Sequence, residues 1–82
     1  MKGKDTEERL AKARAHPLRA RILADLERQT SSPRELSDEL GEPLGNVSYH
    51  VRQLAGLGLV RLVRTTPRRG ALEHHYRAVG RR

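Results

Sequence analysis

Residues 44–60 read LGNVSYHVRQLAGLGLV. In this stretch four apolar residues follow one another at offsets of three, four and three, namely Leu44, Val47, Val51 and Leu54. Such spacing places the four side chains on one face of a helix, where they can be buried together. We therefore predict a helix over residues 44–56 with one buried stripe. An apolar, β-branched run begins directly after it, at residues 58–60.

The side of this helix that faces away from the stripe is polar and carries no carboxylate. Its candidate functional residues are Asn46, Ser48, Tyr49, Arg52 and Gln53. Amides, hydroxyls and a guanidinium are groups that hydrogen-bond base edges and phosphates in the major groove of DNA. A solvated face without acids would have a similar composition, so the neighbouring segments have to decide between the two interpretations.

A second helix is predicted just upstream. Ser32 is a suitable N-cap, Pro33 fits the first helical position, and Glu35 completes a capping box. Gly41 stands where a left-handed residue commonly ends a helix. The two helices, joined by residues 41–43, form a helix-turn-helix whose second member is placed to enter a DNA groove.

Two more helices are expected ahead of this motif. Asp5, followed by acids in the first turn, is a suitable N-cap for a helix over residues 6–15. Pro17 suits the first turn of another helix over residues 17–27. That helix has the widest apolar stripe of the chain, formed by Leu18, Ile22, Leu23 and Leu26. We expect it to be the centre of the core, and residues 1–4 to be disordered.

The segment after the motif predicts a β-hairpin. Residues 59–65 and 72–79 read as strands, and residues 66–70 join them. The hairpin contributes three candidate DNA-binding arginines, Arg64, Arg68 and Arg69. Guanidiniums on such a wing can contact phosphates or the minor groove. The alternative is an exposed turn that uses arginine for solubility. Residues 80–82 are expected to form a disordered basic tail.

Successive side chains of a strand point to opposite faces. In the second strand, one face therefore carries Leu72, His74, Tyr76 and Ala78, and the other carries Glu73, His75 and Arg77. We expect Leu72 and Tyr76 to point toward the core. His74 and His75 lie on opposite faces, which prevents them from binding one metal ion together.

The charges of the chain are unevenly distributed. The 82 residues contain 17 Lys+Arg and 10 Asp+Glu, a formal net charge of +7. Residues 1–42 hold nine basic and nine acidic side chains, whereas residues 43–82 hold eight arginines and one acid, Glu73. A polyanionic partner explains this segregation, because arginines that neutralise phosphates release counterions. A surface that is merely soluble would intersperse the two signs more evenly.

The pattern over residues 16–78 resembles the winged helix-turn-helix domains of ArsR-type (arsenic and metal repressor-like) bacterial regulators. The resemblance is carried by His16-Pro17-Leu18-Arg19, Ile22-Leu23, Leu26, Leu36, Leu40-Gly41, Val47-Ser48-Tyr49-His50-Val51, Leu54, Gly58-Leu59-Val60, Arg64, Gly70 and Tyr76. It implies a DNA-facing or helix-positioning role for His50, and a very short strand at residues 29–31. We include His50 among the DNA-binding candidates.

The resemblance also raises the possibility of metal sensing. The thiolate pair of that family has no counterpart here, because the corresponding residues 34–38 read RELSD and the chain contains no cysteine. We therefore expect no metal site and no cofactor. Since no phosphate loop, nucleophile elbow or inward pair of carboxylates is visible, we also expect that the protein is not an enzyme.

These observations predict one domain over residues 1–82, mainly α with a small β-hairpin, that is, a winged helix-turn-helix. We expect a cytoplasmic protein, because no apolar run approaches the roughly 20 residues that span a bilayer and the N-terminus has no apolar signal core. ArsR-type proteins usually continue into a helix that pairs with the first helix. Because this sequence ends just after the wing, we expect a monomer or a weak homodimer through helix 1.

The predicted function is that of a sequence-specific transcriptional regulator that binds double-stranded DNA. Recognition helix 44–56 would enter the major groove, and the basic wing 65–71 would contact the backbone or minor groove. Two alternatives use the same basic face. One is a winged-helix module that binds an acidic protein, and the other is an RNA binder.

Overall fold

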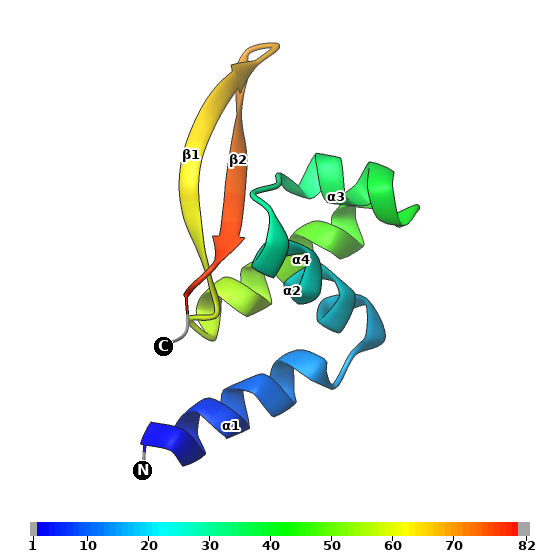
Figure 1. Ribbon diagram of the computed structural model, residues 1–82. Coiled ribbons are helices and arrows are strands. Elements are labelled where there is room, and N and C mark those ends of the chain that lie inside the picture. Colours follow the sequence, from blue (N-terminus) through cyan, green and yellow to red (C-terminus); the bar gives the residue numbers. More distant parts are fainter. Residues whose placement is uncertain (1, 81–82) are drawn as a thin grey trace.

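The computed structural model describes residues 2–80, and side chains from residue 6 onward. Its elements are α1 (Lys2–Arg14), α2 (Pro17–Arg28), α3 (Pro33–Leu40), α4 (Leu44–Gly56), β1 (Val60–Arg68) and β2 (Ala71–Ala78). Helices α2, α3 and α4 form one cluster, the hairpin rises beside it, and α1 extends away below (Figure 1). The predicted fold class, a mainly α winged helix-turn-helix, is confirmed.

The core lies between α2, α4 and the residues that flank them. Its buried apolar residues are Ala13, Ile22, Leu23, Leu26, Leu36, Val47, Val51, Leu54 and Val60. The apolar stripe of α2 is thus central, as its width predicts. The stripe of α4 is buried at three of its four positions, but Leu44 is 40% exposed. Leu44 opens the helix and lines the hollow between α4 and the wing, so its predicted burial is wrong.

The capping signals of α3 are confirmed. The Ser32 hydroxyl accepts a hydrogen bond from the Glu35 amide at 3.1 Å, and the Glu35 carboxylate accepts one from the Ser32 amide at 3.0 Å. Gly41 ends the helix with φ of 67°. Such a left-handed residue is strained for any side chain with a Cβ, which explains a glycine at this turn.

Helix α1 begins earlier than predicted. It starts at Lys2, so Asp5 lies inside the helix instead of capping it, and residues 2–4 are helical. Lysines have high helix propensity and allow the helix to extend past the acidic turn. Ala13 is buried against α2, and Leu10 packs partly against the core. Residues 1, 81 and 82, for which disorder was also predicted, lie outside the described residues.

The wing is longer than predicted because its turn is shorter. Arg69 and Gly70 have φ of 52° and 80°, and residues 68 and 71 already pair. Positive φ at both central residues defines a type I′ turn, whose twist matches that of the flanking strands. The strands therefore continue through residues 66–68, which were predicted to be loop. Pro67 is tolerated there because each strand of a two-stranded sheet has a free edge.

The base of the wing is joined to the loop before α3. The Ser31 amide donates to the Tyr76 carbonyl at 3.0 Å, and the Tyr76 amide donates to the Ser31 carbonyl at 2.8 Å. The short strand implied by the family resemblance is therefore present as a single β-bridge. A bulge between Leu62 and Arg64 interrupts the register just above this point, and β-bulges bend a strand and increase its twist.

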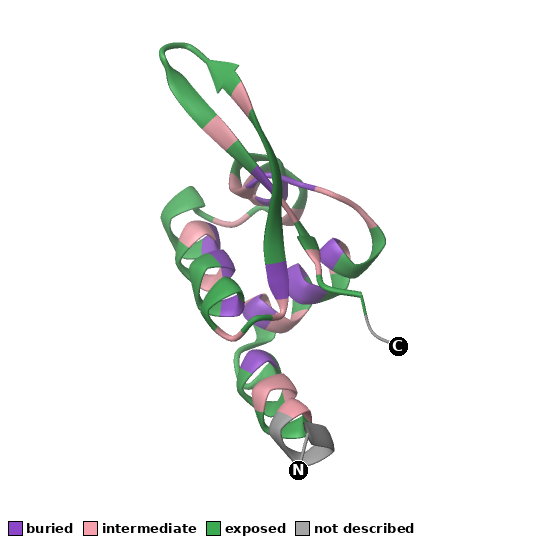
Figure 2. Ribbon diagram, turned by 90° about the vertical axis from the view of Figure 1, so that its left-hand side faces the viewer, coloured by how far each residue is buried: buried purple, intermediate pink, exposed green. Residues whose placement is uncertain are grey.

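The outer part of β2 is oriented differently from the prediction. Leu72 is 58% exposed, whereas His75, on the other face, is only 5% exposed. Tyr76 packs partly against the core, as predicted. Leu72 fails to do so because a hollow, lined on the other side by Leu44 and Ser48 of α4, separates this part of the strand from the helices. Figure 2 shows this mostly exposed hairpin tip above a buried base.

Candidate nucleic-acid interface

The polar face of α4 is presented to solvent. Asn46, Tyr49, Arg52 and Gln53 are exposed, and Ser48 is half-buried. These side chains include donors and acceptors of the kinds that recognise base edges, with Arg52 suited to guanine and the two amides to adenine. The exposed face of α4 can therefore serve as a reading surface.

His50 has a different environment from its neighbours. It is half-buried, and its Nδ1 accepts a hydrogen bond from Nε of Arg19 at 3.1 Å. Its ring also lies 5.5 Å from that of His16, between centroids. Desolvation lowers the pKa of His50 below its usual 6.5, and the positive charges of Arg19 and His16 lower this pKa further. Of the two roles implied for His50, the contacts favour helix positioning over direct contact with DNA.

A concave surface of about 320 Å³ separates α4 from the wing. Helix α4 contributes Ser48 and Arg52 to it, which brings two predicted DNA-binding residues toward β2. The remaining lining residues are Pro33, Arg34, Leu44, Val51, Leu72, Glu73, His74 and Tyr76. Asn46, Tyr49 and Gln53 are not among them. Two of the candidate DNA-binding side chains and the wing thus border one groove, in which Leu72 supplies an apolar surface.

A second hollow, of about 300 Å³, lies on the wing itself. Arg68 and Arg69 from the tip and Arg34 from α3 line it, together with Ala71, Leu72 and Glu73. Arg34 was not predicted as a site residue. Its position after Pro33 gives no local sign of function, because only the docking of the hairpin brings it beside the wing arginines. Arg64 is exposed on β1 and does not line this hollow.

Glu73 is the acid at the centre of this basic region. One oxygen of its carboxylate accepts a hydrogen bond from the Ser32 hydroxyl, and the other lies 3.5 Å from Nη1 of Arg68. The hydrogen bond from Ser32 is the main cause that lowers the pKa of Glu73, with further lowering by Arg68, His75 and Arg34, against the opposing effect of desolvation. The carboxylate is therefore held in its charged form.

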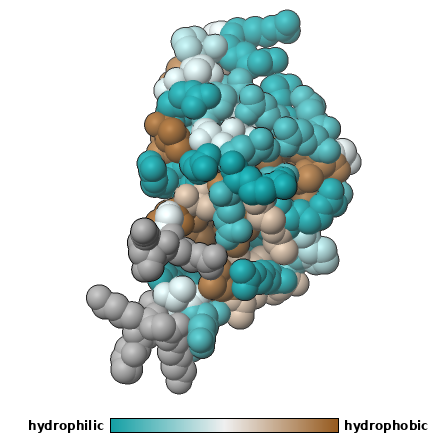
Figure 3. Space-filling view, in the orientation of Figure 1, coloured by the Kyte–Doolittle hydropathy of each residue, from teal (hydrophilic) through white to brown (hydrophobic). Residues whose placement is uncertain are grey.

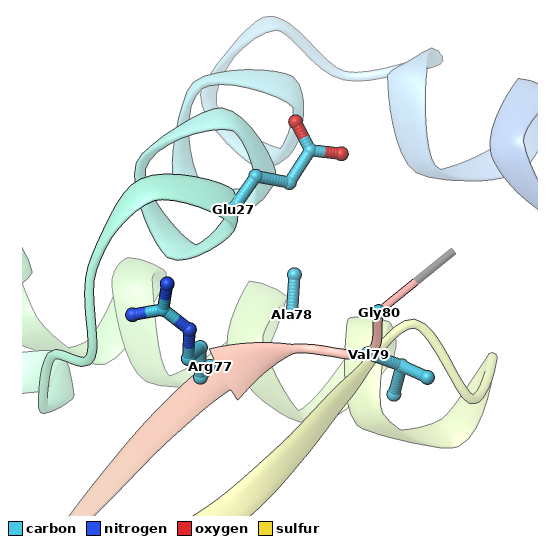
Figure 4. Close-up of a pocket in the computed structure, with 5 residues that line it drawn as sticks. All are labelled: Glu27, Arg77, Ala78, Val79 and Gly80. Carbon is cyan, nitrogen blue, oxygen red and sulfur yellow. The ribbon is translucent and has the colours of Figure 1, made fainter. Parts of the chain in front are cut away.

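The hollow beside α2 is lined by one acid and one arginine. Figure 4 shows a hollow of about 340 Å³ between α2 and the end of β2, with Glu27 on one side and Arg77 on the other. In the view of Figure 3, the surface is mainly hydrophilic, and apolar residues form small separate patches. The basic region of the wing is therefore distinct in composition from the hollow beside α2.

The described residues provide neither a cluster of metal ligands nor a membrane-spanning helix. Within the part of the chain that the structure describes, no group of three His, Cys, Asp or Glu side chains is placed to hold a metal ion. His75 is buried and His74 exposed, so they do lie on opposite faces of β2. Over the same described residues, no helix has the length and apolar character needed to cross a membrane.

The fold and the exposed second helix of the motif define the class of protein, a winged helix-turn-helix. A family model described as "Helix-turn-helix domain" matches residues 15–63, which is more than half of the chain. The protein belongs to this family. No curated protein sequence matches the chain significantly.

Two solved structures are similar over nearly the whole chain. HlyU from Vibrio cholerae N16961 has a TM-score of 0.75 and 28% identity, covering 96% of this chain and 80% of that one. The transcriptional regulator HlyU from Vibrio vulnificus CMCP6 has a TM-score of 0.68 and 29% identity, covering 98% and 84%. Family and likeness together identify a DNA-binding transcription regulator that is not an enzyme.

Proposed function

We propose that the protein is an ArsR-type regulator that recognises specific sequences in double-stranded DNA. Its recognition helix α4 enters the major groove, and the basic wing lies on the backbone or in the minor groove. The observation that carries this proposal is the exposed basic surface from residue 43 onward. The sole acid of that part of the chain, Glu73, has a side chain only 13% exposed. The surface offered to DNA is thus almost purely basic.

The side chains of α4 read the bases. Arg52 donates two hydrogen bonds to O6 and N7 of a guanine, while Asn46 and Gln53 pair with adenine or phosphate. Ser48 and Tyr49 contribute single hydrogen bonds to bases or backbone. His50 has an indirect role, because its hydrogen bond with Arg19 holds α4 in place on α2.

The side chains of the wing bind the backbone. Arg68 and Arg69 at the tip and Arg64 on β1 are exposed. Their guanidiniums can neutralise phosphates on either side of the minor groove. Such contacts fix the position of the protein along the duplex and add affinity without sequence preference.

A salt titration tests the proposal. Binding to a duplex selected from genomic fragments should survive excess nonspecific DNA, and its affinity should fall with salt with a log-log slope steeper than about −3, since each neutralised phosphate adds nearly one unit. A flat titration would remove nucleic acid as the partner. Equal affinity for duplex RNA of the same sequence would instead favour an RNA binder, and binding only to an acidic protein would favour an interaction module.

A further inference from the structure

Glu73 joins three parts of the molecule through one carboxylate. Its Oε2 accepts from the hydroxyl of Ser32, the N-cap of α3, and its Oε1 faces Nη1 of Arg68 at 3.5 Å. Ser32 is fully buried, and the Glu73 side chain is 13% exposed against 52% for Arg68. The carboxylate thus points inward, and the guanidinium it pairs with remains open to solvent.

A second set of contacts, made by His75, also joins the wing to α3. His75 is buried between the wing and α3, with its Nε2 3.1 Å from the hydroxyl of Thr66 and its Nδ1 3.8 Å from the carboxylate of Glu35. Thr66 is also the residue paired with Glu73 across the hairpin. Together with the β-bridge at Ser31, these contacts attach the wing to the start of the helix-turn-helix.

We propose that Glu73 is a positioning residue of the DNA interface, which docks the wing on the N-cap of α3 and holds the Arg68 guanidinium ready for phosphate. The inference rests on the proposed function, because it assigns to Arg68 a phosphate contact. Nη1 of Arg68 faces Glu73, and because the guanidinium has five N–H donors and is 52% exposed, donors remain for DNA. An arginine side chain loses rotamer entropy when it binds, so restraining it before binding favours the complex.

The opposite effect is expected if Glu73 has no positioning role. A carboxylate beside a phosphate-binding surface repels DNA, so its removal would then strengthen binding to every sequence. Glu73→Gln is nearly isosteric and keeps an oxygen that accepts from Ser32, but it loses the ion pair with Arg68. Simple electrostatics and positioning therefore predict opposite signs for the same substitution.

The test measures affinity for preferred and random duplexes at two salt concentrations. For Glu73→Gln we expect binding to be about two- to fivefold weaker on both duplexes, the range of a partly exposed ion pair. The loss should shrink when Arg68→Ala is already present. Glu8→Gln, an exposed site on α1 with the same change in charge, is the matched control and should bind at least as tightly as the unaltered protein.

A further variant tests the length of the side chain separately from its charge. Glu73→Asp keeps the charge but is one methylene shorter, so it cannot bridge Ser32 and Arg68 together, and we expect it also to bind more weakly. Thermal unfolding of each variant shows whether it is folded under the binding conditions. Glu73→Gln binding as tightly as or more tightly than the unaltered protein, or Glu73→Asp binding normally, would overturn the inference.

Amide hydrogen exchange without DNA gives an independent measurement. Loss of docking should speed the exchange of hairpin amides in Glu73→Gln and Glu73→Asp relative to Glu8→Gln. If the unaltered protein fails to bind DNA, the proposed function fails, and the exchange result alone decides the docking part of the inference. Faster exchange in both variants would support docking, and unchanged exchange would refute it.

Discussion

Arg19 links three helices through one buried guanidinium. The residue is 7% exposed, and while its Nε donates to His50 on α4, its Nη1 donates to the Lys12 carbonyl on α1 at 3.1 Å. A buried charge is strongly destabilising unless hydrogen bonds satisfy it, so these contacts also fix where α4 lies. The position of the reading surface therefore depends on a neutral His50, since a protonated Nδ1 cannot accept from Arg19.

The first prediction concerns pH. Because the pKa of His50 is lowered in the folded protein, its protonation favours the unfolded state, and stability should decrease as pH falls below the unfolded value of about 6.5. Glu73 adds a loss only below about 4.5, because its pKa is lowered too. Thermal unfolding between pH 8 and pH 5 should show less pH dependence in His50→Gln, which keeps an acceptor for Arg19.

His74→Gln serves as the control, since it makes the same substitution at a histidine that is exposed on β2. Profiles of His50→Gln and the unaltered protein that coincide over this range would show that His50 does not cause the acid destabilisation.

The second prediction concerns Arg52. Arg52→Ala should cost about 1 to 3 kcal/mol of binding free energy on the preferred duplex and much less on random DNA, because a bidentate contact with guanine is lost. Arg21→Ala, an exposed arginine on α2, removes the same charge away from the interface. Equal losses on both duplexes would instead make Arg52 a backbone contact.

For single residues, the sequence predicts the orientation of a side chain where that orientation depends only on its own helix. The exposed face of α4 follows from helical periodicity alone. Arg19 and Arg34 carried no such signal, because their roles depend on partners 31 residues away at His50 and on the docked hairpin. An arginine is expected to be exposed, and only the fold shows which one is buried.

At the scale of elements, the wing is a long hairpin that packs on the core at its base and also contacts the start of α3. Strands β1 and β2 stay paired from Val60 to the turn, with apolar contacts to the core at the base and a polar contact from Glu73 to Ser32 nearer the tip. The tip arginines Arg68 and Arg69 line a hollow with Arg34 of α3, and no residue of α4 lines it. Substitutions in α4 and in the wing should accordingly impair DNA binding in different ways.

The third prediction follows from that separation. Arg68→Ala combined with Arg69→Ala should weaken binding to preferred and random DNA alike, and should make the salt slope shallower by up to about two units, one for each phosphate contact. Arg14→Ala combined with Arg21→Ala, both exposed on α1 and α2, is the control of equal charge. A selective loss on the preferred duplex would show that the wing reads sequence.

Local signals predicted the elements better than their lengths. The capping box and Gly41 defined α3 correctly, because caps involve only neighbouring residues. The start of α1 and the tip of the wing were placed wrongly. Arg69-Gly70 lacks the Asn or Asp that marks a type I′ turn, and pairing across the hairpin determines the turn more than its own residues do.

For the whole molecule, charge is segregated along an elongated shape of 45 × 23 × 19 Å. The basic residues from position 52 to position 77 lie on α4 and the wing, whereas residues 1–42, which include α1 to α3, have balanced charge. Such asymmetry orients a protein in the field of a polyanion and speeds productive encounter. Composition alone predicted this partner class, although it could not predict that Glu73 is turned inward.

The fourth prediction concerns assembly. Among the described side chains of α1, Ala13 is already buried and Leu10 partly so, which leaves little apolar area for a second copy. A standard interface needs roughly 800 Å² per partner. Light scattering at micromolar concentration should therefore find a monomer or a weak dimer, and Leu10→Ala should abolish any dimer. A dimer that persists at nanomolar concentration would contradict this expectation.

At the turn of the wing, the backbone conformation of Arg69 disfavours the side chain that supplies the positive charge. Arg69 has φ of 52°, a conformation that disfavours side chains other than those of glycine and asparagine by about 1 to 2 kcal/mol. Arg69→Asn should relieve that strain and raise the melting temperature of the hairpin, yet it deletes a guanidinium from the surface proposed to bind DNA. The more stable wing would then bind DNA more weakly, and we expect selection for thermostability to favour replacement of Arg69.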